Sequence, residues 1–237
     1  MRFQTPLIPG TLIRRYMRFL SEVELETGDV VRAHCPNPGS MLGMKDAGLR
    51  VWLEPNDDPK KKLNYGWRLI EYPDGTWAGI DTSLPNKLVK TALADKAIPE
   101  LAAYPSIKPE QKYGQNSRVD FLLQGPDLPD AYVEVKSVTL SRKTGLAEFP
   151  DSVTDRGAKH LAELAQVAAA GHRAILFYVV QRTGCTHVQV ASDIDPAYAS
   201  AYAAARQAGV EVIAYATQID QFGVSLTHPL EHLDPLA

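Results

Sequence analysis

Two stretches decide the fold of this sequence: Ser117–Leu123, which reads SRVDFLL, and Tyr132–Val138, which reads YVEVKSV. In both, apolar residues alternate with polar ones, a period of two that is typical of β-strands. The segment 125–130 between them, GPDLPD, contains one glycine and two prolines and can turn the chain back. The alternation places Glu134 and Lys136 on the same face of their strand. The two stretches therefore predict neighbouring strands of one sheet.

Helical and strand patterns alternate around these stretches and indicate a mixed sheet with helices on its faces. Asn86 and the Ser152–Asp155 spacing of a capping box supply helix starts, and Pro99 and Gly171 supply helix ends. The continuous apolar run Ala174–Val180 is expected of a central strand that is covered on both sides. The expected helices are 86–98, 152–170 and 197–208, and the expected strands are 119–124, 132–140, 174–180 and 210–215.

The first 82 residues have a different character, because short apolar stretches alternate there with turn clusters. Pro73-Asp74-Gly75 is typical of a hairpin turn. The strand candidates are 11–20, 29–34, 50–54, 67–72 and 77–80. Five short strands in this length indicate a small β-barrel, most commonly an OB-fold. We therefore expect an OB-fold-like barrel domain over 1–82 and an α/β domain over 83–237.

Composition sets the class of protein without setting its function. The 237 residues are 45% apolar and 22% charged, with a net charge of −3, as in ordinary globular chains. A weakly acidic total does not exclude a local basic groove, because salt screens charges beyond roughly 10 Å. Cys35 and Cys185 lack metal-site spacing and are expected to be free thiols. Arginines interrupt the N-terminal segment and no run of 18 apolar residues occurs, so a soluble cytoplasmic protein is expected, with no membrane partner.

Asp120 and Glu134 are the candidate metal ligands, because paired strands can bring the two carboxylates together. Mg²⁺ or Mn²⁺ takes few protein oxygens and shares its remaining positions with water and phosphate. Lys136 can orient an attacking water and neutralise charge on a phosphate, and Glu100 can add a third carboxylate. The alternative is that these charges face water or a cross-strand partner, as the charges of a Glu-x-Lys strand commonly do.

Basic residues in several places are candidate DNA contacts. In the barrel segment 14–19, arginines are mixed with Tyr16 and Phe19, which suits either strand tracking with base stacking or an ordinary strand with aromatic core residues. The helix start near 156–160 can bind phosphate or form a solvated face. The full candidate set is Arg14, Arg15, Arg18, Arg118, Arg142, Lys143, Arg156, Lys159 and His160.

Several motifs together resemble the sugar fermentation stimulation protein A (SfsA) family over nearly the whole chain. They are 14–19, 34–41, 117–122, 133–140, 149–161 and 209–212. The resemblance implies an N-terminal OB-fold-like domain, a C-terminal domain related to the PD-(D/E)xK nucleases, non-specific DNA binding and a regulatory link to sugar (maltose) metabolism. By position, Asp120 matches the family's Asp, Glu134 and Lys136 its Glu-x-Lys, and Glu100 its helix acid. Pro38 departs from the pattern, where a small hydroxyl residue is expected.

Three hypotheses follow for function. The first is a DNA-binding protein that retains a Mg²⁺-dependent phosphodiesterase centre, that is, an active endonuclease. The second is a DNA-binding or regulatory protein whose nuclease-like centre does not turn over, because a complete residue set on a nuclease-like fold does not prove catalysis. The third is a binder of small ligands such as oligosaccharides, since barrels of this kind also hold sugars.

Overall fold

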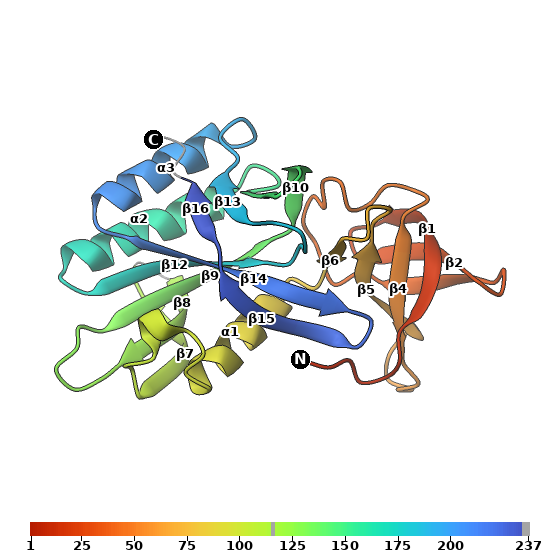
Figure 1. Ribbon diagram of the computed structural model, residues 1–237, viewed down its shortest axis with the longest axis horizontal. Helices are drawn as coiled ribbons and strands as arrows, with labels where there is room; N and C mark the ends of the chain where they lie inside the picture. Colours follow the sequence, from red (N-terminus) through yellow and green to blue (C-terminus); the bar gives the residue numbers. More distant parts are fainter. Residues whose placement is uncertain (115–116, 234–237) are drawn as a thin grey trace.

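The N-terminal part of the chain is a closed five-stranded β-barrel, which lies at one end of the molecule (Figure 1). The computed structural model describes residues 1–114 and 117–233. Strand order is β3-β2-β1-β4-β5-β6, and a β3–β5 pairing closes the ring. The strands are β1 (Ile8–Tyr16), β2 (Leu20–Leu25), β3 (Val30–His34), β4 (Arg50–Pro55), β5 (Tyr65–Glu71) and β6 (Trp77–Gly79). The expected barrel is confirmed.

Strand β1 pairs with β2 on one side and β4 on the other, and Gly10 is paired with both, opposite Leu25 and Val51. A Cβ atom at Gly10 would lie 2.8 Å from the carbonyl oxygen of Glu24, so the glycine permits the close approach. The single strand expected over 11–20 was wrong, because the chain turns at Met17 and Arg18, which both have positive φ. The hairpin at 73–75 is confirmed by the antiparallel β5–β6 pairing.

The C-terminal part is a mixed α/β domain around a six-stranded sheet of order β15-β14-β12-β9-β8-β7. The central pairs β9–β12 and β12–β14 are parallel, and the outer pairs are antiparallel. Its strands are β7 (Ser106–Tyr113), β8 (Ser117–Gln124), β9 (Ala131–Val138), β12 (Arg173–Val180), β14 (Glu211–Asp220) and β15 (Gly223–Pro229). The prediction that β8 and β9 are neighbouring strands is confirmed by their antiparallel pairing. Strand β12 is buried along nearly its whole length, as its apolar run predicts.

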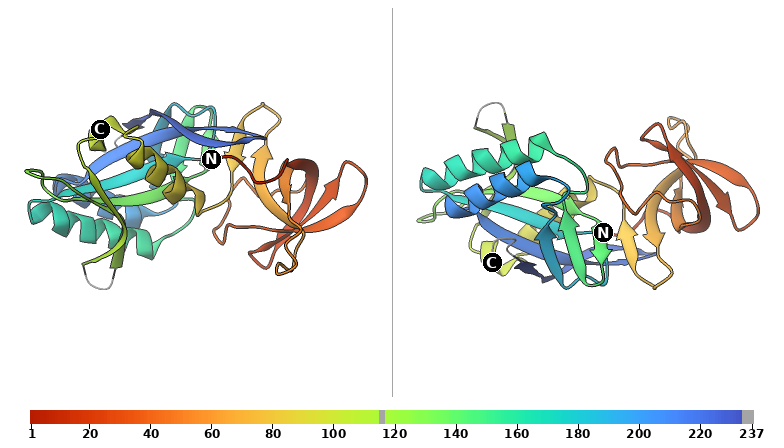
Figure 2. Two further views of the ribbon diagram at one scale, coloured as in Figure 1. Left: turned by 90° about the horizontal axis from the view of Figure 1, so that it is seen from below. Right: turned by 90° about the horizontal axis from the view of Figure 1, so that it is seen from above.

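Helices cover both faces of this sheet (Figure 2). Helix α1 (Leu84–Ala94) buries Leu88 and Val89 against one face, in a core that includes Phe177. Helices α2 (Asp155–Ala169) and α3 (Pro196–Gln207) cover the other face, in a second core that includes Leu161 and Tyr198. Because Glu134 and Lys136 alternate with the α1-facing valines of β9, their side chains lie on the face that α2 covers.

The helix starts differ from expectation in two places. Ser83 is the N-cap of α1, so Asn86 lies inside the helix, and the helix ends at Ala94; a short 3-10 helix, Pro99–Leu101, follows. Thr154 caps α2 by accepting a hydrogen bond from the backbone of Gly157 at 3.0 Å, so the expected capping box at Ser152 was wrong. The third helix matches its expected span within one residue at each end.

A second, four-stranded sheet of order β10-β11-β13-β16 lies beside the main one and was not expected. Its strands are β10 (Leu140–Lys143), β11 (Leu146–Phe149), β13 (His187–Val190) and β16 (Glu231–Leu233).

The barrel joins the α/β domain through the core that holds α1, since Leu7, Trp52 and Leu69 of the barrel are buried in it. Both cysteines are buried and free. Within the described residues, no helix is long and apolar enough to cross a membrane.

Candidate functional site

Asp120 lies where the two deciding strands separate. The β8–β9 ladder runs from Leu123 paired with Ala131 to Phe121 paired with Val133, and stops there. One residue further, the Asp120 carboxylate replaces the lost backbone partner, because its Oδ2 accepts the N–H of Val135 at 2.7 Å. At the end of the ladder, the backbone N–H of Val135 therefore bonds a carboxylate instead of a backbone oxygen, and this bond fixes Asp120 between the two strands.

The second oxygen of Asp120 is held from helix α1. The side-chain amide of Asn86 donates to Asp120 Oδ1 at 2.6 Å. Burial and the nearby charge of Glu134 raise the pKa of Asp120, and the bonds from Val135 and Asn86 offset this only in part. A carboxylate whose ionised form is disfavoured in this way gains from an added cation.

Glu134 is 3% exposed, and its two oxygens have different surroundings. Oε1 accepts from Lys136 Nζ at 2.7 Å and bonds the Nδ1 atom of His160. Oε2 is buried and has no hydrogen-bond partner among the described residues. Burial acts to raise the pKa of Glu134, but the hydrogen bonds from His160 and Lys136 and the charge of Lys136 outweigh it and hold the pKa below its usual value. An ionised, half-satisfied carboxylate is the result.

The two carboxylates line a hollow of about 410 Å³ between strands β7–β9 and helix α2. Asp120 and the buried Glu134 lie among exposed cations from β8 and α2, which gives the hollow both signs of charge. It is lined by Glu110, Ser117, Arg118, Asp120, Glu134, Arg156, Lys159 and His160. Cations around a carboxylate pair can receive a phosphate group while the carboxylates hold a metal ion.

A further buried carboxylate adjoins this hollow, and it is Glu163 on α2. It is 6% exposed, accepts from the Ser117 hydroxyl at 2.8 Å through Oε1, and lies 3.8 Å from Lys159. Its Oε2, like the hydroxyl of Tyr113, is buried without a hydrogen-bond partner among the described residues. Burial and the charges of Glu134 and Glu163 raise the pKa of Tyr113. Glu163 is not among the residues that the sequence predicts at the site.

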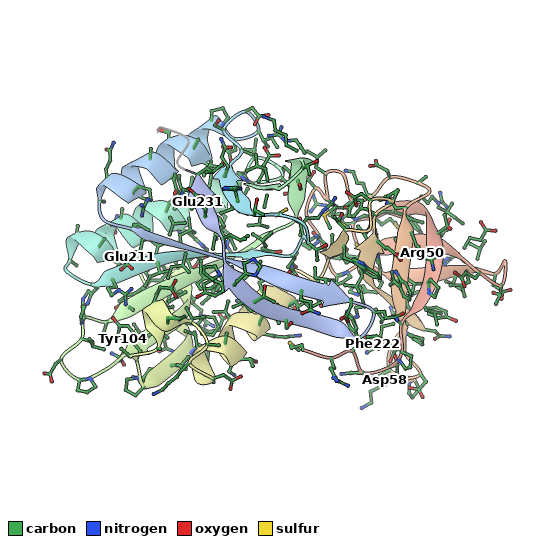
Figure 3. The ribbon with its side chains drawn as sticks, viewed as in Figure 1. Arg50, Asp58, Tyr104, Glu211, Phe222 and Glu231 are labelled. Atoms are coloured by element: carbon green, nitrogen blue, oxygen red, sulfur yellow. The ribbon has the colours of Figure 1, made fainter. Side chains whose placement is uncertain are left out.

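Glu100, the expected third carboxylate, does not join the site. It lies in the short 3-10 helix, where its Oε2 accepts from the hydroxyl of Tyr215 at 3.0 Å, on the face of the sheet that α1 covers. Its backbone oxygen accepts from Arg173, whose guanidinium also contacts Glu211 and Tyr104. Figure 3 places Tyr104 and Glu211 at the end of the α/β domain remote from the barrel. The residue therefore stabilises that end of the sheet.

The candidate DNA contacts divide into those that gather at the hollow and those that do not. Arg118, Arg156 and Lys159 line it and are exposed, whereas His160 is buried behind them. Arg142 is held by Glu148 and Asp193 at 2.6 Å each, and the neighbouring Lys143 is exposed.

The barrel candidates lie on the β1–β2 hairpin, away from the hollow. Arg14 pairs with Glu22 at 2.7 Å, and Arg15 donates to the backbone oxygens of Asn37 and Gly39. Arg18 is at the exposed turn beside Phe19. Two of the three are thus engaged within the barrel.

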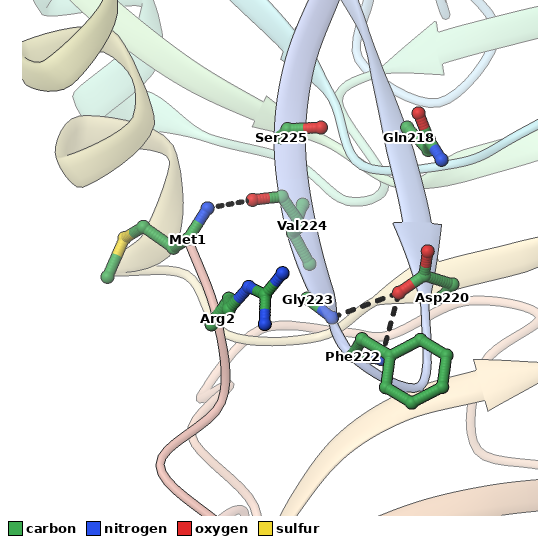
Figure 4. Close-up of a pocket in the computed structure, with 8 residues that line it drawn as sticks. All are labelled: Met1, Arg2, Gln218, Asp220, Phe222, Gly223, Val224 and Ser225. Atoms are coloured by element: carbon green, nitrogen blue, oxygen red, sulfur yellow. Dashed lines mark hydrogen bonds between the residues drawn. The ribbon is translucent and has the colours of Figure 1, made fainter.

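A separate hollow of about 250 Å³ lies beside the N-terminus (Figure 4). Its carboxylate, Asp220, accepts the backbone N–H groups of Phe222 and Gly223 and so stabilises the β14–β15 turn. The Met1 ammonium bonds the backbone oxygen of Val224. These contacts account for the one carboxylate and the terminal ammonium there, so the pair of carboxylates at the other hollow is the better candidate.

Comparisons with known proteins agree with this architecture. A family model described as "SfsA N-terminal OB domain" matches residues 13–80, and one described as "Sugar fermentation stimulation protein RE domain" matches residues 83–223. The chain belongs to the SfsA family. A Dinoroseobacter shibae member, described as a sugar fermentation stimulation protein homolog, is 65% identical over 238 residues, which cover 100% of this chain and 97% of the relative.

Other SfsA-family proteins extend the comparison to a solved structure. The Ruegeria pomeroyi homolog is 62% identical over 230 residues, covering 97% of this chain and 100% of the relative. The structure of Pyrococcus furiosus SfsA in complex with Ca²⁺ is similar with a TM-score of 0.86 and 27% identity, covering 98% of each chain. The fold of this chain is therefore the fold of a solved family member.

The residues present can hold a divalent cation only if water or phosphate supplies the remaining ligands. No group of three or more His, Cys, Asp or Glu side chains is arranged around one point in the part of the chain that the structure describes. Asp120 and the unpartnered Oε2 of Glu134 supply hard oxygen donors, which suit Mg²⁺, Mn²⁺ or Ca²⁺. Such an ion would complete its coordination with water and phosphate oxygens.

Proposed function

We propose that this SfsA-family protein binds DNA non-specifically and holds a divalent cation between Asp120 and Glu134. The observation that carries the cation site is the buried Oε2 of Glu134, which has no hydrogen-bond partner among the described residues. A buried ionised oxygen without a donor is costly, and a cation bound there removes the cost. The Ca²⁺ complex of the Pyrococcus furiosus relative supports a cation in this family.

DNA is the proposed partner because cations surround the carboxylates. Arg118, Arg156 and Lys159 are exposed at the hollow, where backbone phosphates can reach both them and a bound metal. The net charge of −3 does not oppose this, since the attraction acts over roughly 10 Å. The exposed Arg18 and Phe19 of the barrel offer a second contact region, suited to strand tracking and stacking.

Hydrolysis of the phosphodiester is the second candidate function, and the position of Lys136 favours it. Its ammonium lies 2.7 Å from Glu134 Oε1, so it is fixed beside the carboxylate pair. When bound, the cation would act as a Lewis acid and lower the pKa of a coordinated water. Lys136 would orient the attacking water and stabilise charge that develops on the phosphate, while Arg118 and Arg156 bind the flanking backbone.

The family description adds a link to sugar metabolism, for which a regulatory role of DNA binding is the simplest account. A direct oligosaccharide site is the competing reading. A titration with maltodextrin, run beside the DNA titration, separates the two: the proposal expects DNA binding and no response to the sugar.

The test of DNA binding is a filter-binding titration at several salt concentrations. Log affinity should fall linearly with log salt. Arg118→Ala and Arg156→Ala should each weaken binding to all sequences alike and reduce the slope by about one. Arg142→Ala is the matched control, because that guanidinium already pairs with two carboxylates. An affinity that does not change with salt would contradict the proposal.

A further inference from the structure

His160 is the most buried of the residues that the sequence places among the DNA contacts. It is 6% exposed and lies on α2 behind Arg156, so its ring does not reach the surface as a phosphate ligand would. Its Nδ1 atom bonds Glu134 Oε1 and lies 3.3 Å from Lys136 Nζ. The residue therefore faces the carboxylate.

The surroundings of the ring decide which nitrogen carries the proton. Arg156 Nε lies 3.3 Å from His160 Nε2 and donates to it. A guanidinium N–H can only donate, so Nε2 is the acceptor and the proton is on Nδ1. His160 Nδ1–H consequently donates to Glu134 Oε1, and the 3.3 Å contact with Lys136, a donor, is a close approach without a hydrogen bond.

We propose that His160 is a positioning residue that fixes Glu134 for the cation, an inference that rests on the proposed metal site. His160 and Lys136 both donate to Oε1, which leaves Oε2 as the free oxygen. Two donors on one oxygen prevent the carboxylate from rotating to offer Oε1 instead. The hydrogen bonds that link Arg156, His160 and Glu134 thus select Oε2 of Glu134 as the metal ligand. Outer hydrogen bonds orient the ligands of other metal sites in the same way.

The two hydrogen bonds from Arg156 to His160 and from His160 to Glu134 also connect the exposed cations of the hollow with its buried carboxylate. Arg156 contributes its Nε to the ring, while its other two nitrogens are not needed for this bond and can meet a phosphate. A cation on the surface and a carboxylate at depth are therefore linked through one imidazole. Replacing the ring should weaken metal binding without removing the surface charge.

Two substitutions separate the hydrogen bond from the volume of the ring. His160→Leu keeps an apolar body and removes the donor. His160→Asn places an amide N–H close to the position of Nδ1 and so preserves donation to Glu134. His228→Leu is the control, because His228 is exposed on β15. Each protein, freed of metal with a chelator, is titrated with Ca²⁺ in a calorimeter and melted without metal.

We expect His160→Leu to lose about 10- to 100-fold in Ca²⁺ affinity, as outer hydrogen-bond partners of metal ligands commonly do. His160→Asn should recover most of that loss, and His228→Leu should match the wild type. DNA affinity measured in chelator should be unchanged in all three. These results together would support the positioning role.

Other outcomes overturn one proposal or the other. A wild type that binds no Ca²⁺ removes the proposed metal site itself. A wild type that binds Ca²⁺ beside a His160→Leu variant of equal affinity removes the role of His160 alone. Equal losses in His160→Leu and His160→Asn would show that the shape of the ring matters and the hydrogen bond does not. A fall in metal-free DNA affinity for His160→Leu would return His160 to the phosphate contacts.

Discussion

The side-chain amide of Asn86 donates to Asp120 Oδ1 at 2.6 Å, and this bond ties helix α1 to the strand that carries the carboxylate. Helix α1 begins at Leu84, directly after the barrel, and Asn86 is its third residue. Thr82, just before the helix, donates from its backbone to Pro36 of the barrel at 3.3 Å. The position of Asp120 therefore depends on the point where the two parts of the chain meet.

Asn86→Ala should weaken Ca²⁺ binding by about tenfold. Without the amide, Asp120 keeps only the bond from Val135 and can rotate away from Glu134. A calorimetric titration measures the change. Lys90→Ala, an exposed substitution on the same helix, is the control. If both variants bind Ca²⁺ as the wild type does, Asn86 has no part in positioning Asp120.

Stabilisation by Ca²⁺ should grow as the pH rises. The pKa of Asp120 is raised by burial and by the charge of Glu134, so the metal-free folded state binds a proton more readily there than the unfolded chain does. Stability from this group is therefore lost as the pH rises from 3.8 through the raised value. Ca²⁺ competes with the proton for Asp120, and its binding replaces the stability that is lost when the proton leaves.

Thermal melts with and without Ca²⁺ at pH 4 and pH 7 test this. Free Ca²⁺ at 100 times its dissociation constant adds about 2.7 kcal/mol, which is a shift of roughly 5–10 °C for a chain of this size. The shift should be large at pH 7 and small at pH 4. Asp120→Asn should show no shift at either pH. Equal shifts at both pH values in the wild type would argue against Asp120 as a ligand.

Arg142→Ala should destabilise the fold and leave DNA affinity nearly unchanged. Its guanidinium pairs with Glu148, whose side chain is 8% exposed, and with Asp193, and it lowers the pKa of Asp193 to about 2. Removing it leaves the Glu148 carboxylate with the backbone N–H of residue 142 in place of three donors, at a cost of about 1–3 kcal/mol. A chemical melt and a DNA titration measure both effects, with Lys143→Ala as the exposed control. A stable variant with weakened DNA binding would restore Arg142 to the phosphate contacts.

The sequence predicts the local part of the site and misses the part that the fold brings together. The period of two correctly places Glu134 and Lys136 on one face, since that depends only on neighbours in one strand. Asn86 and His160 reach the carboxylates from helices 34 and 26 residues away along the chain. No spacing rule relates such positions, and the same holds for Glu163, which is buried and accepts from Ser117, 46 residues away along the chain.

Two errors in the fold have the same origin in backbone conformation. The β1–β2 turn was not visible because Met17 and Arg18 take positive φ without a glycine to mark the turn. Strand β7 was missed because Pro109 and the positive φ of Glu110 interrupt its pattern, which an edge strand tolerates. Glu100 was placed at the site because the chain direction after Pro99 is not readable from sequence.

Lys136→Ala separates a working catalytic centre from an inert one. In the catalytic case the variant keeps metal and DNA, because Asp120 and Glu134 still hold the ion and His160 still donates to Glu134 Oε1. It loses cleavage by about 10²–10³, the usual effect of removing one preorganised group that acts on the transition state. Lys143→Ala, a nearby exposed lysine, should cleave normally.

In the inert case the same substitution acts on stability alone. The Lys136 side chain is 13% exposed and 2.7 Å from Glu134 Oε1, so its removal leaves the Glu134 charge less compensated beside Asp120. Thermal melts and overnight digests of supercoiled and single-stranded DNA with Mn²⁺, on wild type and variant, distinguish the two. Cleavage by the wild type that disappears in a folded, metal-binding variant establishes hydrolysis. An inactive wild type beside a destabilised variant assigns Lys136 to charge balance, and the protein is then a DNA-binding one whose metal centre does not turn over.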